Sequence, residues 1–291
     1  MRGVNLHVYA GIDQLKAAID QGAKLFRYQV MPETDLAKSL GKNLPEYSRF
    51  MRENYWPKID SFIPHLGDCK LLIDMHQPVG GGDAFYGSTE LIGAWVWTWQ
   101  ETAKRYKGVK EVVGYGLLNE PSGRSGKVSE LMRVGVNTIR QIDTEKVIAV
   151  TCRHSKPDNF SDTPHFADPN IWYEVHYYEP MRFTHMGLKN HTGTGTSRAN
   201  YPTASFGPVA MARAMKPMIK FRERHPNAQI FVGEFSVNQN VKTADRVRYI
   251  RDLVALMNRY NFHWAYHIVG EPNSVWEAGP DVLEELKKGW S

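Results

Sequence analysis

The chain has 291 residues, of which 42% are hydrophobic and 23% are charged, which is enough to bury a large core and excludes disordered, collagen-like and small disulfide-stapled classes. Lys and Arg number 36 against 31 for Asp and Glu, a net charge of +5. Because this surplus is spread along the chain, and its densest stretch, 220–224, contains Glu223, we expect no nucleic-acid partner.

Eight short apolar runs recur along the chain, and turn residues bound each of them. They lie near residues 2–8, 23–30, 69–75, 112–118, 146–151, 171–177, 229–234 and 262–268. Runs such as Lys70–Ile73 and Val147–Val150 are apolar at almost every position. This pattern is typical of strands that are covered on both faces, as in a parallel sheet.

Apolar residues recur at helical spacing between most of these runs. In chain order they are Ile12, Leu15 and Ile19; Tyr55, Ile59, Phe62 and Leu66; Ile92, Trp95 and Trp99; Leu131, Val134, Thr138 and Ile142; Met211, Met215 and Met218; Val247, Ile250, Val254 and Met257; and Val282 and Leu286. The connection 153–169 is rich in Pro, Asp and His and has no helical period, so we expect a loop there.

Eight strand–helix units in a chain of this length predict an α/β protein with a (β/α)8 TIM barrel. An open doubly wound sheet is the alternative, but no Gly-rich dinucleotide turn follows the first run. No linker or change of composition divides the sequence. We therefore expect residues 1–291 to form a single domain, and a monomer.

Three features bear on location. No window approaches about 18 uninterrupted apolar residues, so we expect no membrane span. Cys69 starts one predicted strand and Cys152 ends another, which puts them at opposite barrel ends and predicts free thiols rather than a disulfide. The first ten residues show no signal-like apolar region. We expect a secreted or periplasmic protein whose signal is absent from this chain, and a cytoplasmic location stays open.

The carboxyl ends of barrel strands face the active site, so polar residues at these positions are the first candidates. They are His7, Arg27, Asp74, His76, Asn119, Glu120, His176, Tyr178, Glu234 and the segment 264–267. Glu120 and Glu234 follow apolar runs and point to a common mouth. Acetal hydrolysis requires such a pair, one carboxyl as the acid and the other as the nucleophile or base.

The strings LLIDMHQP, GYGLLNEP, YEVHYYEP and FVGEFS occur in this order and at these spacings. With them the chain resembles glycoside hydrolase family 5, the cellulase-type retaining (β/α)8 glycosidases, over residues 2 to about 270. The resemblance implies that Glu120 is the general acid/base and Glu234 the nucleophile. Their carboxyl groups would then lie about 5 to 5.5 Å apart.

The same resemblance implies the roles of the neighbouring side chains. Asn119 would hold the 2-hydroxyl of the sugar in the −1 subsite, which His76 would line, and His176 would orient Glu120. Tyr178 and Arg27 would donate to Glu234 and keep it ionised. On physical grounds we expect the guanidinium of Arg27 to lower the pKa of Glu234, and burial to raise the pKa of Glu120.

The chain departs from the family pattern at the last strand. Many members read W-A-Y-W there, with the last Trp as the floor beneath the −1 sugar, whereas this chain reads Trp264-Ala265-Tyr266-His267. Either Trp264 takes the floor position, or His267 replaces a stacking surface with a hydrogen-bonding one. In the second case, plain cellulose becomes a less certain substrate.

Aromatic residues are further candidates for sugar subsites. We expect Phe85, Tyr86, Tyr201 and Trp276 at the mouth, and at least two of Trp95, Trp97 and Trp99 in the core. The long connection 179–208 and the loop after the third strand, 80–87, would shape the two ends of a cleft.

The sequence favours a retaining endo-β-1,4-glucanase-like hydrolase that needs no cofactor and acts on a polysaccharide. Mannan, another β-linked polymer or a bacterial exopolysaccharide are alternative substrates, and a non-catalytic carbohydrate-binding barrel is an alternative function. A metal-dependent barrel hydrolase is a third hypothesis. Neither a His-x-His on the first strand nor a His-Glu-x-x-His is present, so we expect no metal.

Overall fold

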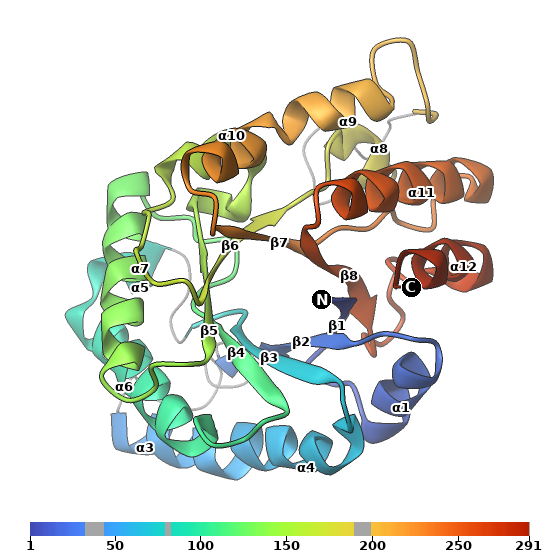
Figure 1. The fold of residues 1–291 in the computed structure, drawn as a ribbon. Helices are drawn as coiled ribbons and strands as arrows, with labels where there is room; N and C mark the ends of the chain where they lie inside the picture. Colours follow the sequence, from blue (N-terminus) through green and yellow to red (C-terminus); the bar gives the residue numbers. More distant parts are fainter. Residues whose placement is uncertain (33–43, 79–82, 189–198, 291) are drawn as a thin grey trace.

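The computed structural model describes residues 1–32, 44–78, 83–188 and 199–290. Eight parallel strands form a closed barrel in chain order, from β1 to β8, and β8 pairs with β1. Figure 1 shows the helices around the outside of this barrel. The predicted (β/α)8 barrel is therefore confirmed, and the open doubly wound sheet is wrong.

The strands follow the predicted runs closely. They are β1 Arg2–Leu6, β2 Leu25–Val30, β3 Lys70–Met75, β4 Val112–Gly116, β5 Val147–Thr151, β6 Ile171–His176, β7 Gln229–Glu234 and β8 His263–Val269. Parallel pairing sets their carboxyl ends at one rim, for example with Asn5 opposite Arg27 on β1 and β2.

The helical segments connect the strands on the outside of the barrel. They are α1 Ile12–Asp20, α3 Leu44–Phe50, the π-helix η1 Met51–Tyr55, α4 Trp56–Leu66, α5 Asp83–Gly87, α6 Thr89–Tyr106, α7 Ser125–Arg140, the 3-10 helices η2 Arg153–Ser155 and η3 Pro157–Asp162, α8 Met181–Thr184, α9 Pro208–Ala214, α10 Lys216–Arg224, α11 Thr243–Arg259 and α12 Gly279–Trp290. The expected loop at 153–169 is wrong in part, because η2 and η3 occupy its first half.

The helices bury one face each, as the helical spacing of apolar residues requires. In α6, Ser88 caps the N-terminus by accepting a hydrogen bond from the Leu91 amide. Trp95 and Trp99 of this helix are buried, and Trp97 is half-buried. The prediction that at least two of these three tryptophans lie in the core is confirmed.

Along each of three strands, the side chains that face the barrel interior change from apolar to charged between one inward-facing residue and the next. A lower layer consists of Leu25, Leu72, Ala149, Trp172, Phe231 and Ala265. Two residues further along β2, β3 and β6 stand Arg27, Asp74 and Glu174, all of them buried. Because strand side chains alternate between faces, these charged groups lie directly above the apolar layer and toward the carboxyl rim.

Both cysteines are buried and free, as predicted from their positions at opposite ends of strands. Among the described residues, no helix is both long enough and apolar enough to cross a membrane.

Candidate active site

A cavity of about 450 Å³ opens at the carboxyl rim of the barrel. Seven of the predicted site residues line it, from five different strands or the loops that follow them. They are His76, Asn119, Glu120, His176, Tyr178, Glu234 and His267. Arg27 lies beneath them, fully buried. The barrel thus brings together side chains that are up to 240 residues apart in the sequence, from Arg27 to His267.

Two carboxylates face each other in this cavity. One oxygen of Glu120 and one of Glu234 lie within 4.8 Å of each other. Glu234 ends β7 and its side chain is only 6% exposed, whereas the side chain of Glu120 is 47% exposed. Glu120 has a φ of 40°, a left-handed conformation that is strained for a residue with a side chain. Such strain occurs most often at functional sites.

Donors and charges surround the carboxylate of Glu234. Arg27 Nη1 lies 3.0 Å from Oε1, and the hydroxyl of Tyr178 donates to Oε2 at 3.0 Å. Burial opposes ionisation, but the charges of His176 and Arg27 hold the pKa of Glu234 well below its usual range. Burial lowers the pKa of His267 to about 4, so this neighbour is neutral at pH 7. Glu234 is therefore a carboxylate at neutral pH.

Among the described residues, the side chain of Glu120 has one hydrogen-bonding partner, His176, whose Nδ1 lies 3.0 Å from Oε1. Burial would lower the pKa of His176, but the charge of Glu234 and the hydrogen bonds with Glu120 and Glu174 raise it to about 10. Burial would likewise raise the pKa of Glu120, but the hydrogen bond and the charge of His176 lower it. The expectation that the pKa of Glu120 is raised is wrong for this state of the site, because its histidine neighbour is charged.

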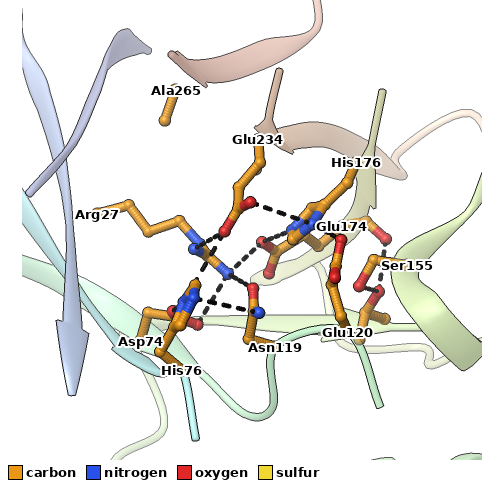
Figure 2. A network of polar contacts seen from close by, with 12 residues as sticks. Arg27, Asp74, His76, Asn119, Glu120, Ser155, Glu174, His176, Glu234 and Ala265 are labelled. Atoms are coloured by element: carbon orange, nitrogen blue, oxygen red, sulfur yellow. Dashed lines mark hydrogen bonds and ion pairs between the residues drawn. The ribbon is translucent and has the colours of Figure 1, made fainter. Parts of the chain in front are cut away.

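Arg27 is the centre of the polar network beneath the cavity (Figure 2). Its Nη1 donates to Asn5 at 2.9 Å, and its Nη2 donates to the side-chain oxygen of Asn119 at 2.8 Å. The same Nη2 lies 3.0 Å from both Asp74 and Glu174. A single guanidinium thus lies within ion-pair distance of three buried carboxylates, counting Glu234, and fixes the orientation of Asn119.

His76 and Asn119 lie side by side on the β3 and β4 side of the cavity. His76 Nδ1 lies 3.0 Å from Asp74 Oδ2, and its Nε2 lies 3.4 Å from Asn119 Nδ2. Asn119 is held from below by Arg27 and from the side by His76. Both side chains line the cavity next to the two glutamates, as expected from the sequence.

Trp264 was one of two predicted candidates for the floor of the site, and this prediction is wrong. Its side chain is fully buried, packs on Phe235 and donates from Nε1 to Asn258 at 3.0 Å, on the helix side of the sheet. The second candidate, His267, lines the cavity, and its Nδ1 lies 3.6 Å from Glu234 Oε2. Alternation along β8 puts Ala265 and His267 inside the barrel and Trp264 outside.

Of the four aromatic candidates at the mouth, only Trp276 lines the cavity. Phe85 and Tyr201 are buried in the core, so their prediction as subsite residues is wrong. Tyr86 is half-buried, packs close to Gly123 and is not among the residues that line the cavity.

The structure describes only part of each of the two loops that were expected to shape the ends of the cleft. The start of the long connection contributes Glu179, Met181 and His185 to the lining. Its stretch 192–196, and residues 80–82 of the loop after β3, lie outside the described residues.

Sequence reasoning missed several residues of the site. Asn5 and Glu174 lie in the buried network, and His154, Lys156 and His185 line the cavity. The sequence does indicate Glu174: it lies two residues before His176 on the same strand, so its side chain is expected on the same face, inside the barrel. His154 and Lys156 come from the connection 153–169, for which only a loop was expected.

Glu120, His176 and Glu234 are the one set among the described residues whose atoms lie close enough to hold a metal ion. The set fits a cation poorly. Arg27 already compensates Glu234, and the imidazole of His176 is protonated at neutral pH. A metal would have to displace this proton and compete with the guanidinium, so the absence of a catalytic metal stays a prediction.

Comparison with known proteins adds independent information. The family described as cellulase (glycosyl hydrolase family 5) matches residues 1–271. Cellodextrinase A of Ruminococcus flavefaciens is 24% identical over 207 residues, which cover 66% of this chain and 60% of that protein. Endoglucanase C of Acetivibrio thermocellus is 25% identical over 224 residues, which cover 66% and 65%. The chain thus spans less than two thirds of the length of these curated relatives.

The barrel is shared with solved structures, among them the following two. Endoglucanase Cel5A of Thermotoga maritima superimposes with a TM-score of 0.83 at 19% identity, covering 98% of this chain and 96% of that chain. The cellulose synthase subunit Z of Clostridioides difficile gives a TM-score of 0.77 at 21% identity and covers 98% of both chains. At these identities the likeness is one of fold.

Proposed function

Because a match over residues 1–271 shows that the chain belongs to the cellulase family, glycosyl hydrolase family 5, we propose that it is a retaining endo-glucanase-like hydrolase of β-1,4-linked glucan. We take residues 1–291 as one catalytic domain. The observation that carries the proposal is the pair Glu120 and Glu234, with carboxylate oxygens within 4.8 Å of each other. Retaining enzymes place their carboxyls about 5 to 5.5 Å apart, whereas inverting enzymes need about 6.5 Å or more to admit a water.

The electrostatics support different roles for the two glutamates. Glu234 is buried beside Arg27 and Tyr178 and stays ionised, which suits a nucleophile. Glu120 is more exposed and shares a hydrogen bond with His176, which suits the group that exchanges a proton with the leaving oxygen and then with water.

The proposed reaction has two steps. In the first, the carboxylate of Glu234 attacks the anomeric carbon while Glu120, hydrogen-bonded to His176, protonates the glycosidic oxygen. The bond between the anomeric carbon and this oxygen breaks, and its electron pair stays with the leaving sugar. In the second, a water gives its proton to Glu120 and its hydroxyl to the anomeric carbon, which releases Glu234. The configuration at the anomeric carbon is retained.

The remaining residues of the cavity support binding of a sugar. Asn119, held by Arg27, presents its amide beside the glutamates and suits the 2-hydroxyl. His76, His267 and Trp276 supply the walls. Thermotoga maritima Cel5A has been solved in complex with cellobiose and with mannotriose. Glucan is therefore the first substrate to test, and mannan the second.

Hydrolysis assays test the proposal directly. We expect reducing ends to appear from soluble β-1,4-glucan with the wild type and a loss of at least about a thousandfold with Glu234→Gln, because the nucleophile is removed. Glu130→Gln changes an exposed glutamate on α7 and serves as the control. Product sizing across glucan, mannan, xyloglucan and bacterial exopolysaccharides identifies the preferred polymer and separates internal from terminal cleavage.

The alternative of a carbohydrate-binding barrel without turnover makes the opposite prediction. Wild type and Glu234→Gln would then bind the polymers equally and release no sugar from any of them. A polymeric substrate does not cross membranes, which supports the expectation of a secreted or periplasmic enzyme. Cell fractionation followed by immunoblotting of each fraction tests this location.

A further inference from the structure

Glu174 is a fully buried carboxylate that the proposed reaction does not use. It lies on β6, two residues before His176, with 1% of its surface exposed. Its Oε1 lies 3.0 Å from Arg27 Nη2, as an ion pair, and 3.2 Å from His176 Nε2. A buried carboxylate is costly unless it is paired, so this position serves a specific purpose.

The neighbouring strand leaves room for this carboxylate. A Cβ placed on Gly233 of β7 would lie 1.9 Å from Glu174 Oε1, which is far inside the contact distance. Gly233 directly precedes Glu234 in the chain. The absence of a side chain at position 233 therefore leaves the space in which the carboxylate of Glu174 lies next to Nε2 of His176.

His176 is surrounded by more negative than positive charge. Its Nδ1 lies 3.0 Å from Glu120 and 3.7 Å from Glu234, and its Nε2 faces Glu174. Arg27, Asp74, His76, Tyr178 and His267 lie around this cluster. The charged and titratable residues that line the same cavity are His154, Lys156, Glu179 and His185. Arg27 is compensated by Asp74, Glu174 and Glu234, and His267 is neutral at pH 7.

We propose that Glu174 is a positioning residue that keeps one proton on the His176–Glu120 pair, by holding a fixed negative charge against Nε2 of His176. This contact also fixes the ring: Nε2 faces inward to Glu174, so Nδ1 faces Glu120. The inference rests on the proposed function, in which this pair supplies the proton for the leaving oxygen.

The proton balance follows from the reaction steps. Before the reaction, the pair holds one proton more than a neutral imidazole plus a carboxylate. In the first step this proton moves to the glycosidic oxygen, as Glu234 bonds to the anomeric carbon and loses its charge. The pair is left as neutral His176 and ionised Glu120, and in the second step water restores the proton. Glu174 takes no part in this proton transfer.

A purely structural role is the competing interpretation. In that case Glu174 only compensates Arg27, and its replacement lowers stability without changing how the His176–Glu120 pair titrates. The two interpretations differ in the pH dependence of the pair, which a structural role does not affect.

Glu174→Gln is the decisive variant, because it removes the charge and keeps the size. The ring nitrogens of His176 in the free enzyme are followed by NMR of protein with 15N-labelled histidine, and the signals are assigned by their loss in His176→Asn. We expect His176 to titrate near 10 in the wild type and about one to three units lower in Glu174→Gln, since a charge within hydrogen-bond distance has an effect of this size. The alkaline limb of kcat/KM should move down equally.

Two further variants complete the experiment. Glu174→Asp keeps the charge, so the alkaline limb should stay closer to that of the wild type than to that of Glu174→Gln. Glu130→Gln removes a surface charge and should move nothing. The proposal is overturned if folded Glu174→Gln titrates like the wild type. It is also overturned if His176 of the wild type titrates near its ordinary value, which needs no variant to fold. The NMR result does not depend on turnover, so it fails separately from the proposed function.

Discussion

Replacing Gly233 by Ala tests the fit between β6 and β7 beneath the active site. The new methyl group would stand 1.9 Å from Oε1 and 2.7 Å from Cδ of Glu174. The backbone of Gly233 does not have a positive φ, so its conformation accommodates Ala, and the conflict is a steric clash of the methyl group with Glu174. Glu174 would have to leave its place between Arg27 and His176.

The size of the effect follows from two contributions. Overpacking a core costs about 1 to 3 kcal/mol, and breaking a buried ion pair costs about 3 to 5 kcal/mol. Since the displaced side chain keeps part of its contacts, we expect a loss of about 3 kcal/mol in the free energy of unfolding. At about 2 to 4 °C per kcal/mol, the melting temperature should fall by roughly 6 to 12 °C.

Thermal unfolding followed by circular dichroism measures this shift. Gly93→Ala is the matched control, because Gly93 is exposed within α6 and no atom lies within 4 Å of its added Cβ. Ala is also the better helix former, so this control should melt at the same temperature or higher. A melting temperature of Gly233→Ala within about 1 °C of the wild type would refute the packing argument.

Three further predictions concern the site. Tyr178→Phe removes the donor to ionised Glu234, worth about 1.5 to 3 kcal/mol, and should therefore move the acid limb of kcat/KM up by roughly one to two pH units; Tyr115→Phe, which loses a similar bond to Asp143, should leave that limb in place. Trp276→Ala should raise KM roughly tenfold or more with little change in kcat, because a stacked aromatic contributes about 1.5 to 3 kcal/mol, and an equal fall in kcat instead would argue against a binding role. Prolonged treatment with a chelator should leave the rate unchanged, and a loss that added metal restores would revive the metal-dependent hypothesis.

The sequence predicted the barrel because its strands are short apolar runs with turn residues between them. It also predicted the glutamate pair, since both residues directly follow such runs and barrel strands end at one rim. The alternation of side chains along a strand also predicts which residues share a face of the sheet. It puts Glu174 on the same face of β6 as His176, and it puts Trp264 on the face of β8 opposite to that of His267. Both corrections follow from this one geometric rule.

Other features could not be predicted from the chain alone. The pKa of Glu120 depends on the charge of His176, which in turn depends on three carboxylates from separate strands. The lining residues His154 and Lys156 come from a connection with no periodic pattern. Phe85 and Tyr201 look like exposed aromatics of loops, but tertiary packing buries them. These properties arise from contacts between distant segments.

The most direct test of the account is to trap the covalent intermediate on Glu234. A 2-deoxy-2-fluoro β-cellobioside with a good leaving group should slow the second step more than the first, so that the sugar accumulates on the nucleophile. Mass spectrometry of the intact protein and its peptides should show one added cellobiosyl unit on the peptide that contains Glu234. Turnover of β-glucan with no adduct, or with an adduct on another residue, would contradict the account.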